Sequence, residues 1–456
     1  MRHKQRASVS LVKTAPPAES EFEVSGASIE RMRQERIVYD GVTGLPVHPF
    51  EAPERATLVE RIEHLGVIYI QVGKFFGFEE LHGWEQYDRI LLVVAEGVRE
   101  DATKSRFSDC LVSIRFSGSD GFYVLFDLPT QAPGRYGPAL EEEAARFQAN
   151  ALRRLRNSFG GATGDLMSVH ASSLTALDNP RTRPSRHLIR TLAEAAKIVT
   201  QQQTRERIDL YAELKGILSE KQLRAAFQPV CRLSDGAIVG YEALIRGPEG
   251  SALERPNALF AVSHQNDMDV ELESLCLETI FAKLPRAVLS RRLFVNASAT
   301  LLRHAIFLNE RNLSAIARCH SEVVIEISEK EVVGDYASFR EILEKIRRAN
   351  FKIAIDDAGS GYSGLETILY LRPDYIKIAD SLVRHLETDP IKREIIASLA
   401  SIGRRIQASI IAEGIERAEE CGSLVELEIE YGQGFLLGRP SFQVPPRRRN
   451  GAARGL

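Results

Sequence analysis

After residue 220, short β-rich runs alternate with helical stretches, and this alternation restricts the possible folds more than any other feature of the chain. The runs are LRAAFQPV, AIVGYEALIR, RRLFVNAS, EVVIEIS, KIAIDDAG, DYIKIAD, ASIIAEG and EYGQGFLLG. Segments with helical character, such as SFREILEKIRRAN and PIKREIIASLASIGRR, separate most of them. Alternating β and α units over roughly 220 residues predict a (β/α)8 TIM-like barrel within an α/β protein.

The first two runs cannot be joined by a helix, because only RLSDG lies between them. Parallel strands need a crossover of a dozen or more residues, whereas antiparallel strands can be joined by a short turn. We therefore expect an antiparallel first strand, which is a departure from a regular barrel.

A second α/β region precedes the barrel, and we assign residues 37–200 to it and residues 201–445 to the barrel domain. GVIYIQV is typical of a buried strand, CLVSIRF-SGSDG-FYVLF predicts a β-hairpin, and residues 139–156 predict a helix. Helical spacing over residues 185–218 indicates either one connecting helix or two helices in succession. Residues 1–36 predict a flexible arm and residues 446–456 a frayed basic tail.

Charge and cysteine content exclude several classes of function. Lys and Arg number 59 against 62 Asp and Glu, which gives a net charge of −3 and no basic excess for binding a nucleic-acid polymer. The five cysteines form no CxxC pair, which argues against a thiolate zinc site or a disulfide framework. We expect no membrane span, because no apolar run approaches the length that a bilayer requires, and we expect a cytoplasmic protein.

Polar residues follow seven consecutive predicted strands at their C-terminal ends, where the active sites of such barrels lie. These residues are Glu242, Asn296, Glu326, Asp356 with Asp357, Lys377, Glu413 and Gln433. Each has an ordinary structural explanation when taken singly, such as a turn at Asp357 or a surface position for Lys377. Five carboxylates at one rim would repel each other, however, unless cations lay among them.

Carboxylate and amide oxygens are the ligands that Mg²⁺ or Mn²⁺ prefers, whereas zinc and copper prefer His and Cys. Two such ions, with Asp356 between them, suit phosphodiester hydrolysis. Arg246 could hold a phosphate oxygen through its planar guanidinium group. Lys377 could orient the attacking water, or accept its proton if the pKa of Lys377 is depressed.

These residues resemble the motifs of EAL-domain cyclic di-GMP phosphodiesterases over residues 205–442. The matching motifs are Gln228-Pro229, Glu242-Ala243-Leu244-Ile245-Arg246, Asn296, Glu326-Ile327-Ser328-Glu329, Asp356-Asp357, Lys377-Ile378, Glu413-Gly414-Ile415-Glu416 and Gln433-Gly434-Phe435. The resemblance implies hydrolysis of cyclic di-GMP to linear pGpG, and a possible homodimer through the EAL domain.

The resemblance also implies a role for each matching residue. Metal ligands are Glu242, Asn296, Glu326, Asp356, Asp357 and Glu413. Lys377, Gln433 and Glu413 are catalytic, and Gln228, Leu244 and Arg246 bind the substrate. Glu329 and Glu416 stabilise loops.

Three departures from the family pattern bear on the rate and its regulation. Ala379 replaces the Asp of Lys-Ile-Asp, Ala358 replaces a Phe after the paired aspartates, and residues 264–268 replace Ala-Glu-x-x-Gly. They favour an alternative in which the chain is a receptor that holds cyclic di-GMP, or a protein partner, without cleaving the nucleotide. A purely structural role would leave the acidic rim unexplained.

Residues 37–200 resemble, over fewer motifs, a degenerate GGDEF (diguanylate cyclase) domain. The matching motifs are Asp40-Gly41-Val42-Thr43-Gly44-Leu45-Pro46 and Gly118-Ser119-Asp120-Gly121-Phe122. Gly121 has replaced an acidic residue, and Gln71-Val72-Gly73 lacks the metal-binding Asp of a cyclase. We therefore expect no cyclase activity, and a regulatory role in which this domain binds a regulatory protein or a nucleotide.

Overall fold

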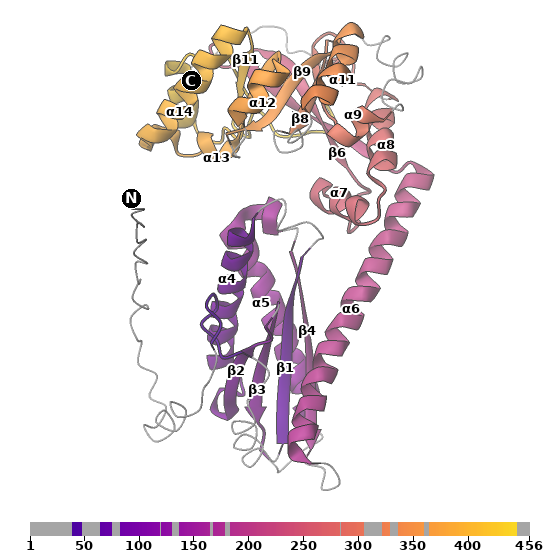
Figure 1. Cartoon of the computed structure of the whole chain (residues 1–456), viewed down its shortest axis with the longest axis vertical. Coiled ribbons are helices and arrows are strands. Elements are labelled where there is room, and N and C mark those ends of the chain that lie inside the picture. Colours follow the sequence, from indigo (N-terminus) through magenta and orange to yellow (C-terminus); the bar gives the residue numbers. More distant parts are fainter. Residues whose placement is uncertain are drawn as a thin grey trace, which may run out of the picture. The chain divides into compact units, whose positions relative to one another are not determined.

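The computed structural model describes residues 39–47, 64–74, 83–118, 120–129, 136–164, 167–177, 183–282, 284–304, 322–328, 336–359 and 364–444 (Figure 1). The chain divides into two compact units, the first built mainly from residues before Thr200 and the second mainly from Thr200 onward. The predicted arm at residues 1–36, the predicted tail at residues 446–456 and Glu329 lie outside the described residues.

The first unit is built on a four-stranded sheet in the order β2-β3-β1-β4, as far as the described residues show. Its elements are β1 (His64–Lys74), α4 (Trp84–Thr103), β2 (Leu111–Phe116), β3 (Gly121–Asp127), α5 (Tyr136–Gly164) and β4 (Met167–Leu177). Strands β2 and β3 are antiparallel, which confirms the hairpin, and the helix predicted at residues 139–156 lies inside α5. Ile68 and Ile70 on one face of β1, and Val67 and Tyr69 on the other, are all buried, so both faces of this strand are covered.

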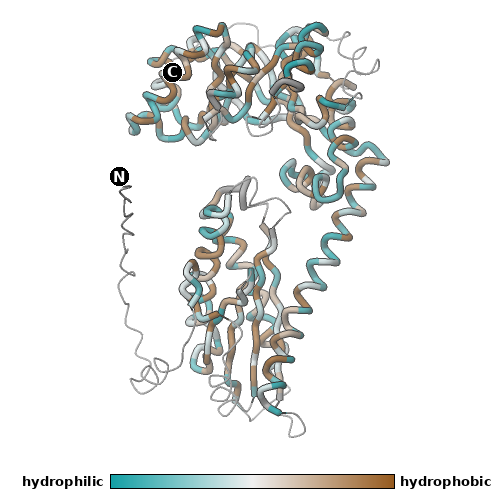
Figure 2. The backbone as a smooth tube through the Cα atoms, viewed as in Figure 1, coloured by the Kyte–Doolittle hydropathy of each residue, from teal (hydrophilic) through white to brown (hydrophobic). Residues whose placement is uncertain are grey.

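Helix α6 (Pro184–Glu220) is one continuous helix of 37 residues, so the alternative of two successive helices is wrong. Its first part packs Leu188, Leu192 and Val199 into the core of the sheet, and its last part packs Leu214 and Ile217 into the core of the barrel. The stretch QQQTRER between them is hydrophilic (Figure 2) but contains residues that tolerate helical geometry, so the helix does not break there.

Among the described helices, none is both long enough and apolar enough to cross a membrane.

The second unit is a closed barrel of eight strands within the described residues, in the order β10-β11-β12-β5-β6-β7-β8-β9. The strands are β5 (Arg224–Arg232), β6 (Ile238–Arg246), β7 (Arg292–Asn296), β8 (Val323–Ser328), β9 (Lys352–Ala358), β10 (Tyr375–Ile378), β11 (Ser409–Ala412) and β12 (Tyr431–Gly432). Strand β5 is antiparallel to both β6 and β12, and the other neighbouring pairs are parallel. The predicted TIM-like barrel and its antiparallel first strand are confirmed.

Helices pack around the outside of this barrel (Figure 1). They are α7 (Pro256–Gln265), α8 (Asp269–Ala282), α9 (Ala299–Arg303), α11 (Tyr336–Arg348), α12 (Gly364–Leu371), α13 (Asp380–Val383), α14 (Pro390–Ile406) and α15 (Ala418–Glu426). Outward-facing strand residues such as Ile325, Ile353 and Ile376 pack with helix residues such as Leu343 and Leu399 in the larger core. This core holds the strands in register and so determines which side chains point into the barrel.

Candidate active site

Alternation along the barrel strands brings the polar residues to one rim. Side chains two residues apart in a strand point to the same face. The barrel interior contains a cluster of apolar residues. In six strands, the residue two positions after the apolar one is polar. The pairs are Phe294 and Asn296, Val324 and Glu326, Ala354 and Asp356, Tyr375 and Lys377, Ile411 and Glu413, and Tyr431 and Gln433. Strand β5 runs the other way, so Gln228 precedes Val230. The polar ends of these inner faces therefore meet above an apolar interior.

Lys377 lies at the centre of the acidic residues. Its Nζ atom is 2.8 Å from Glu326 Oε1, 2.8 Å from Glu413 Oε1, 3.0 Å from Asp356 Oδ1 and 3.6 Å from Glu242 Oε2. The side chain of Lys377 is 1% exposed. A buried ammonium among four carboxylates leaves an excess of negative charge in a region that water reaches poorly.

Amide groups connect the carboxylates to one another. Asn296 Nδ2 donates to Glu242 Oε1 (3.0 Å) and to Glu326 Oε2 (3.1 Å). Gln433 Nε2 donates to Glu242 Oε2 (2.6 Å) and to Gln228 Oε1 (3.0 Å), and Gln228 donates in turn to the backbone carbonyl of Gly438 (3.0 Å). These hydrogen bonds fix the orientation of Glu242.

A β-bulge brings Asp357 to the same rim as Asp356. Regular alternation would point these two neighbours to opposite faces. The pairing of β9 with β10 shifts register here, since Ile355 pairs with Ile376 but Ala358 pairs with Ile378, and Asp357 has a φ of 58°. Bulges re-aim side chains in this way.

Carboxylate oxygens of Asp356, Asp357 and Glu413 lie within 4.8 Å of one another, as metal ligands would. The donors are all oxygen atoms, which suits Mg²⁺ or Mn²⁺. Within the described residues, Asp356 Oδ1 and Glu326 Oε1 are buried and accept no regular hydrogen bond, although both lie close to the Lys377 ammonium. The residues present therefore fit a divalent-cation site.

The protonation of the cluster is displaced from that of free side chains. Burial raises the pKa of Glu326 well above its usual value, and the charge of Glu242 adds to the effect. Burial and the charge of Asp356 raise the pKa of Glu413 in the same direction. Burial lowers the pKa of Lys377, but the carboxylates around it, led by Asp356, raise that pKa well above its usual value.

A falling pH should weaken Mn²⁺ binding to this cluster. Carboxyl groups with a raised pKa hold protons at a higher pH, and a cation must displace those protons in order to bind. We expect the Mn²⁺ affinity to fall steadily as the pH is lowered, and proton release to accompany binding. Calorimetry in buffers of different ionisation enthalpy measures both. A pH-independent affinity with no proton release would contradict this reading of the cluster.

A cavity of about 260 Å³ adjoins Asn296 and Glu326, between the ends of β6 and β7 and helices α7 and α8. Leu244 and Arg246, which the resemblance assigns to substrate binding, both contribute to its lining. Arg246 is half-buried, and its Nη1 donates to the carbonyl of Ile245 (2.7 Å). The cavity thus combines apolar walls with a guanidinium group beside the acidic rim.

Two buried glutamates near the rim were missed in the sequence. Glu273 lines the cavity and accepts the backbone N–H of Ser298 (2.8 Å). Glu420 is 2% exposed and accepts the backbone N–H groups of His385 (3.1 Å), Glu416 (3.0 Å) and Arg417 (3.1 Å). Glu273 could have been found from the sequence, because it is an acidic residue on the buried face of an apolar helix.

Glu420 holds the loop after β11. The resemblance implied that Glu416 would stabilise a loop. The side chain of Glu416 is 46% exposed and lies 3.7 Å from Arg384 Nη2. Its contribution through that exposed contact is small.

Comparison with known protein families identifies the barrel. A family model described as "EAL domain" matches residues 212–440, which is half of the chain. Among curated proteins, the bifunctional diguanylate cyclase/cyclic di-GMP phosphodiesterase MucR of Pseudomonas aeruginosa is 24% identical over 92% of this chain and 63% of its own length. The cyclic di-GMP phosphodiesterase NbdA of the same species is 24% identical over 91% of this chain and 53% of its own length.

This chain therefore spans 63% and 53% of the lengths of these two relatives. Among solved structures, a PaMucR phosphodiesterase in complex with c-di-GMP is 28% identical, with a TM-score of 0.46, and the match covers 51% of this chain and 97% of that one.

Proposed function

The chain belongs to the EAL domain family, and from this premise we propose that its barrel hydrolyses cyclic di-GMP to linear pGpG with Mg²⁺ or Mn²⁺. The observation that carries the proposal is the buried cluster in which Lys377 meets four carboxylates at the C-terminal rim. The purified chain incubated with cyclic di-GMP and Mn²⁺ should form pGpG, which chromatography detects. Tight binding of the nucleotide with no product over hours would reject hydrolysis and favour a receptor.

The ions would be held by Glu242, Asn296, Glu326, Asp356, Asp357 and Glu413. Divalent ions at such a site supply Lewis acidity for phosphodiester hydrolysis. Because the Lys377 ammonium lies within 3.0 Å of Glu326, Asp356 and Glu413, we assign Lys377 to orienting the attacking water and offsetting negative charge, and not to accepting a proton. Glu413, whose Oε1 lies 2.8 Å from the Lys377 ammonium, is the carboxylate that we assign to accepting the proton of the water.

The substrate would lie across the rim, with a phosphate oxygen on Arg246 and apolar contact with Leu244. Guanidinium groups hold phosphate oxygens through two parallel hydrogen bonds. Gln433 and Gln228 would keep Glu242 oriented through the amide contacts described above. Arg246 is assigned to the phosphate and not to the ions. Loss of its guanidinium group should therefore weaken substrate binding more than ion binding.

A substitution at Ala379 tests whether the missing carboxylate limits hydrolysis, as the receptor alternative supposes. It is 2% exposed and directly follows the last residue of β10, beside Lys377 and Ile378. We expect Ala379→Asp to raise the rate of pGpG formation about tenfold, because it restores a carboxylate next to the metal ligands. Steady-state assays in Mn²⁺ measure the rate, and Ala379→Asn, which has the same size but no charge, is the control. An unchanged rate in Ala379→Asp would show that the existing ligands suffice.

For the first unit, we propose a regulatory role without cyclase activity. A Cβ atom at Gly121 would lie 2.2 Å from the hydroxyl of Tyr69, so an acidic side chain does not fit at this position of the hairpin. Asp120, the remaining acidic residue there, accepts a hydrogen bond from Tyr87 (2.7 Å). The side chains of Tyr69 and Tyr87 thus occupy the hairpin, which argues against catalysis there and leaves binding of a regulatory protein or a nucleotide as the role that we propose.

We also propose a homodimer through the barrel domain. Helix α12 presents Leu369 and Tyr370, which are 67% and 50% exposed, and Ile391 at the start of α14 is 71% exposed. Exposed apolar side chains of this size are typical of protein interfaces when they gather in one patch.

A further inference from the structure

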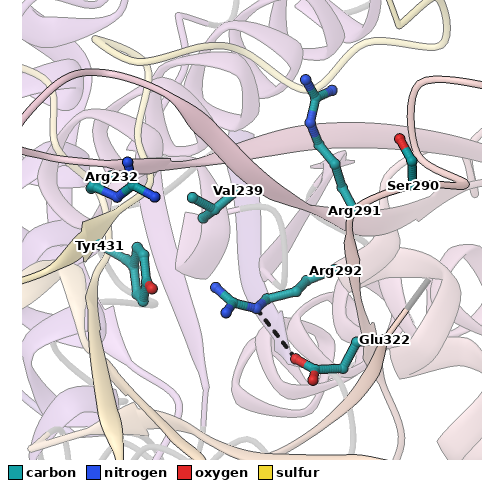
Figure 3. A pocket seen from close by; sticks show the side chains of 7 residues that line it. All are labelled: Arg232, Val239, Ser290, Arg291, Arg292, Glu322 and Tyr431. Carbon is teal, nitrogen blue, oxygen red and sulfur yellow. Dashed lines mark hydrogen bonds and ion pairs between the residues drawn. The ribbon is translucent and has the colours of Figure 1, made fainter.

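A pocket of about 360 Å³ lies at the end of the barrel opposite the acidic rim (Figure 3). Its lining residues are Arg232, Val239, Ser290, Arg291, Arg292, Glu322 and Tyr431. Arg292 begins β7 and Asn296 ends it, so the two ends of this strand are about 13 Å apart. The pocket is therefore separate from the candidate active site. The N-terminal end of such barrels ordinarily serves stability, so a basic pocket there calls for a different explanation.

Arg292 is held in place before any ligand arrives. Its guanidinium carbon lies 5.6 Å from the ring centroid of Tyr375 and 5.4 Å from that of Tyr431. Its Nε donates to Glu322 Oε1 (3.2 Å), and the same oxygen accepts the hydroxyl of Tyr375 (3.1 Å). Figure 3 shows the terminal nitrogens of Arg292 directed toward Tyr431 and away from Glu322. The Tyr431 hydroxyl also bonds Arg292, so the terminal nitrogens reach the pocket beside that hydroxyl, with little side-chain entropy left to lose.

Arg232 approaches the same space from the end of β5, and Figure 3 shows Arg291 turned away from it. Arg232 pairs with Asp235 (2.8 Å), but both side chains are about half exposed, so this ion pair is weak and exchangeable. Arg291 donates to the hydroxyl of Tyr241 (3.4 Å). Among the described residues that line the pocket, two arginines (Arg232 and Arg292) face it and one residue is a carboxylate (Glu322), which leaves the lining with an excess of positive charge.

We propose that this pocket binds the phosphate group of a small phosphate-bearing anion between Arg232 and Arg292. A tetrahedral phosphate accepts two hydrogen bonds from each planar guanidinium fork, and such charge-assisted pairs are about twice as strong as neutral ones. The anion would replace Asp235 as the partner of Arg232, while Glu322 stays on the inner side of Arg292. The adjoining side chains of Val239 and Tyr431 offer apolar contact to whatever carries the phosphate.

Calorimetric titration of the full chain with inorganic phosphate, and separately with GMP, tests the proposal. A chelator removes divalent cations, so that the acidic rim repels phosphate. We expect saturable binding that weakens about tenfold or more in Arg292→Gln and in Arg232→Gln. Arg404→Gln removes a comparable 3.2 Å surface pair with Glu428 and should bind as the unchanged chain does. Arg232 is 44% exposed, so its variant tests the site even if Arg292→Gln misfolds.

Equal affinities for phosphate and GMP would identify the free anion as a sufficient ligand, and tighter binding of GMP would identify a phosphate ester. Either result supports the site if the arginine variants bind the same probe more weakly. No binding of either probe, or equal binding by Arg232→Gln and the unchanged chain, would overturn the proposal.

Discussion

The variant Asp356→Asn should lose pGpG formation by about a thousandfold or more. The change keeps the size of the side chain but removes the negative charge that lies 3.0 Å from Lys377 and beside Asp357 and Glu413. Loss of one preorganised electrostatic contact at a reacting group commonly costs about 10²–10³ in rate, and loss of a shared ion would add to that. Initial rates of pGpG formation at saturating Mn²⁺ measure the effect.

Asp209→Asn is the matched control, because Asp209 is an exposed residue of α6. We expect it to retain the activity of the unchanged chain. Activity of Asp356→Asn within a few fold of this control would contradict the assignment of Asp356 to the catalytic centre.

Lys377→Met should lower the free energy of unfolding by about 3–5 kcal/mol when divalent ions are chelated. In the described structure the ammonium offsets part of the negative charge of Glu326, Glu413 and Asp356, and without it these carboxylates face one another at short range. Denaturant unfolding at about pH 8, followed by circular dichroism, measures the loss. Added Mn²⁺ should restore part of the stability, because an ion that binds only the folded state stabilises it.

Lys345→Met on the exposed face of α11 provides the comparison, since it deletes the same charge outside the cluster. A Lys377→Met variant as stable as Lys345→Met in chelator would mean that the cluster does not depend on the ammonium. If Mn²⁺ does not stabilise Lys377→Met, a divalent ion cannot take the place of the missing ammonium charge.

The barrel and most of its rim could be predicted because two local rules determine them. Strand alternation and the common direction of the strand ends together bring Asn296, Glu326 and Lys377 to one side. Neither rule requires knowledge of tertiary packing, so a single sequence was enough to predict them.

The details of the site depend on tertiary structure and could not be predicted in the same way. The bulge that turns Asp357 to the rim appears only when β9 pairs with β10. The raised pKa of Lys377 follows from distances that no sequence pattern contains. The role of Glu420 depends on backbone N–H groups from two separate loops. The continuity of α6 was equally open, because its polar middle allows either a helix or a break.

Titration of the purified chain with Mn²⁺ tests the central claim most directly, namely that the carboxylates around Lys377 bind divalent cations. The account predicts saturable uptake in calorimetry, a markedly weaker response in Asp356→Asn, and an unchanged response in Asp209→Asn. Absence of uptake by the unchanged chain, with or without cyclic di-GMP, or equal uptake by Asp356→Asn, would contradict it.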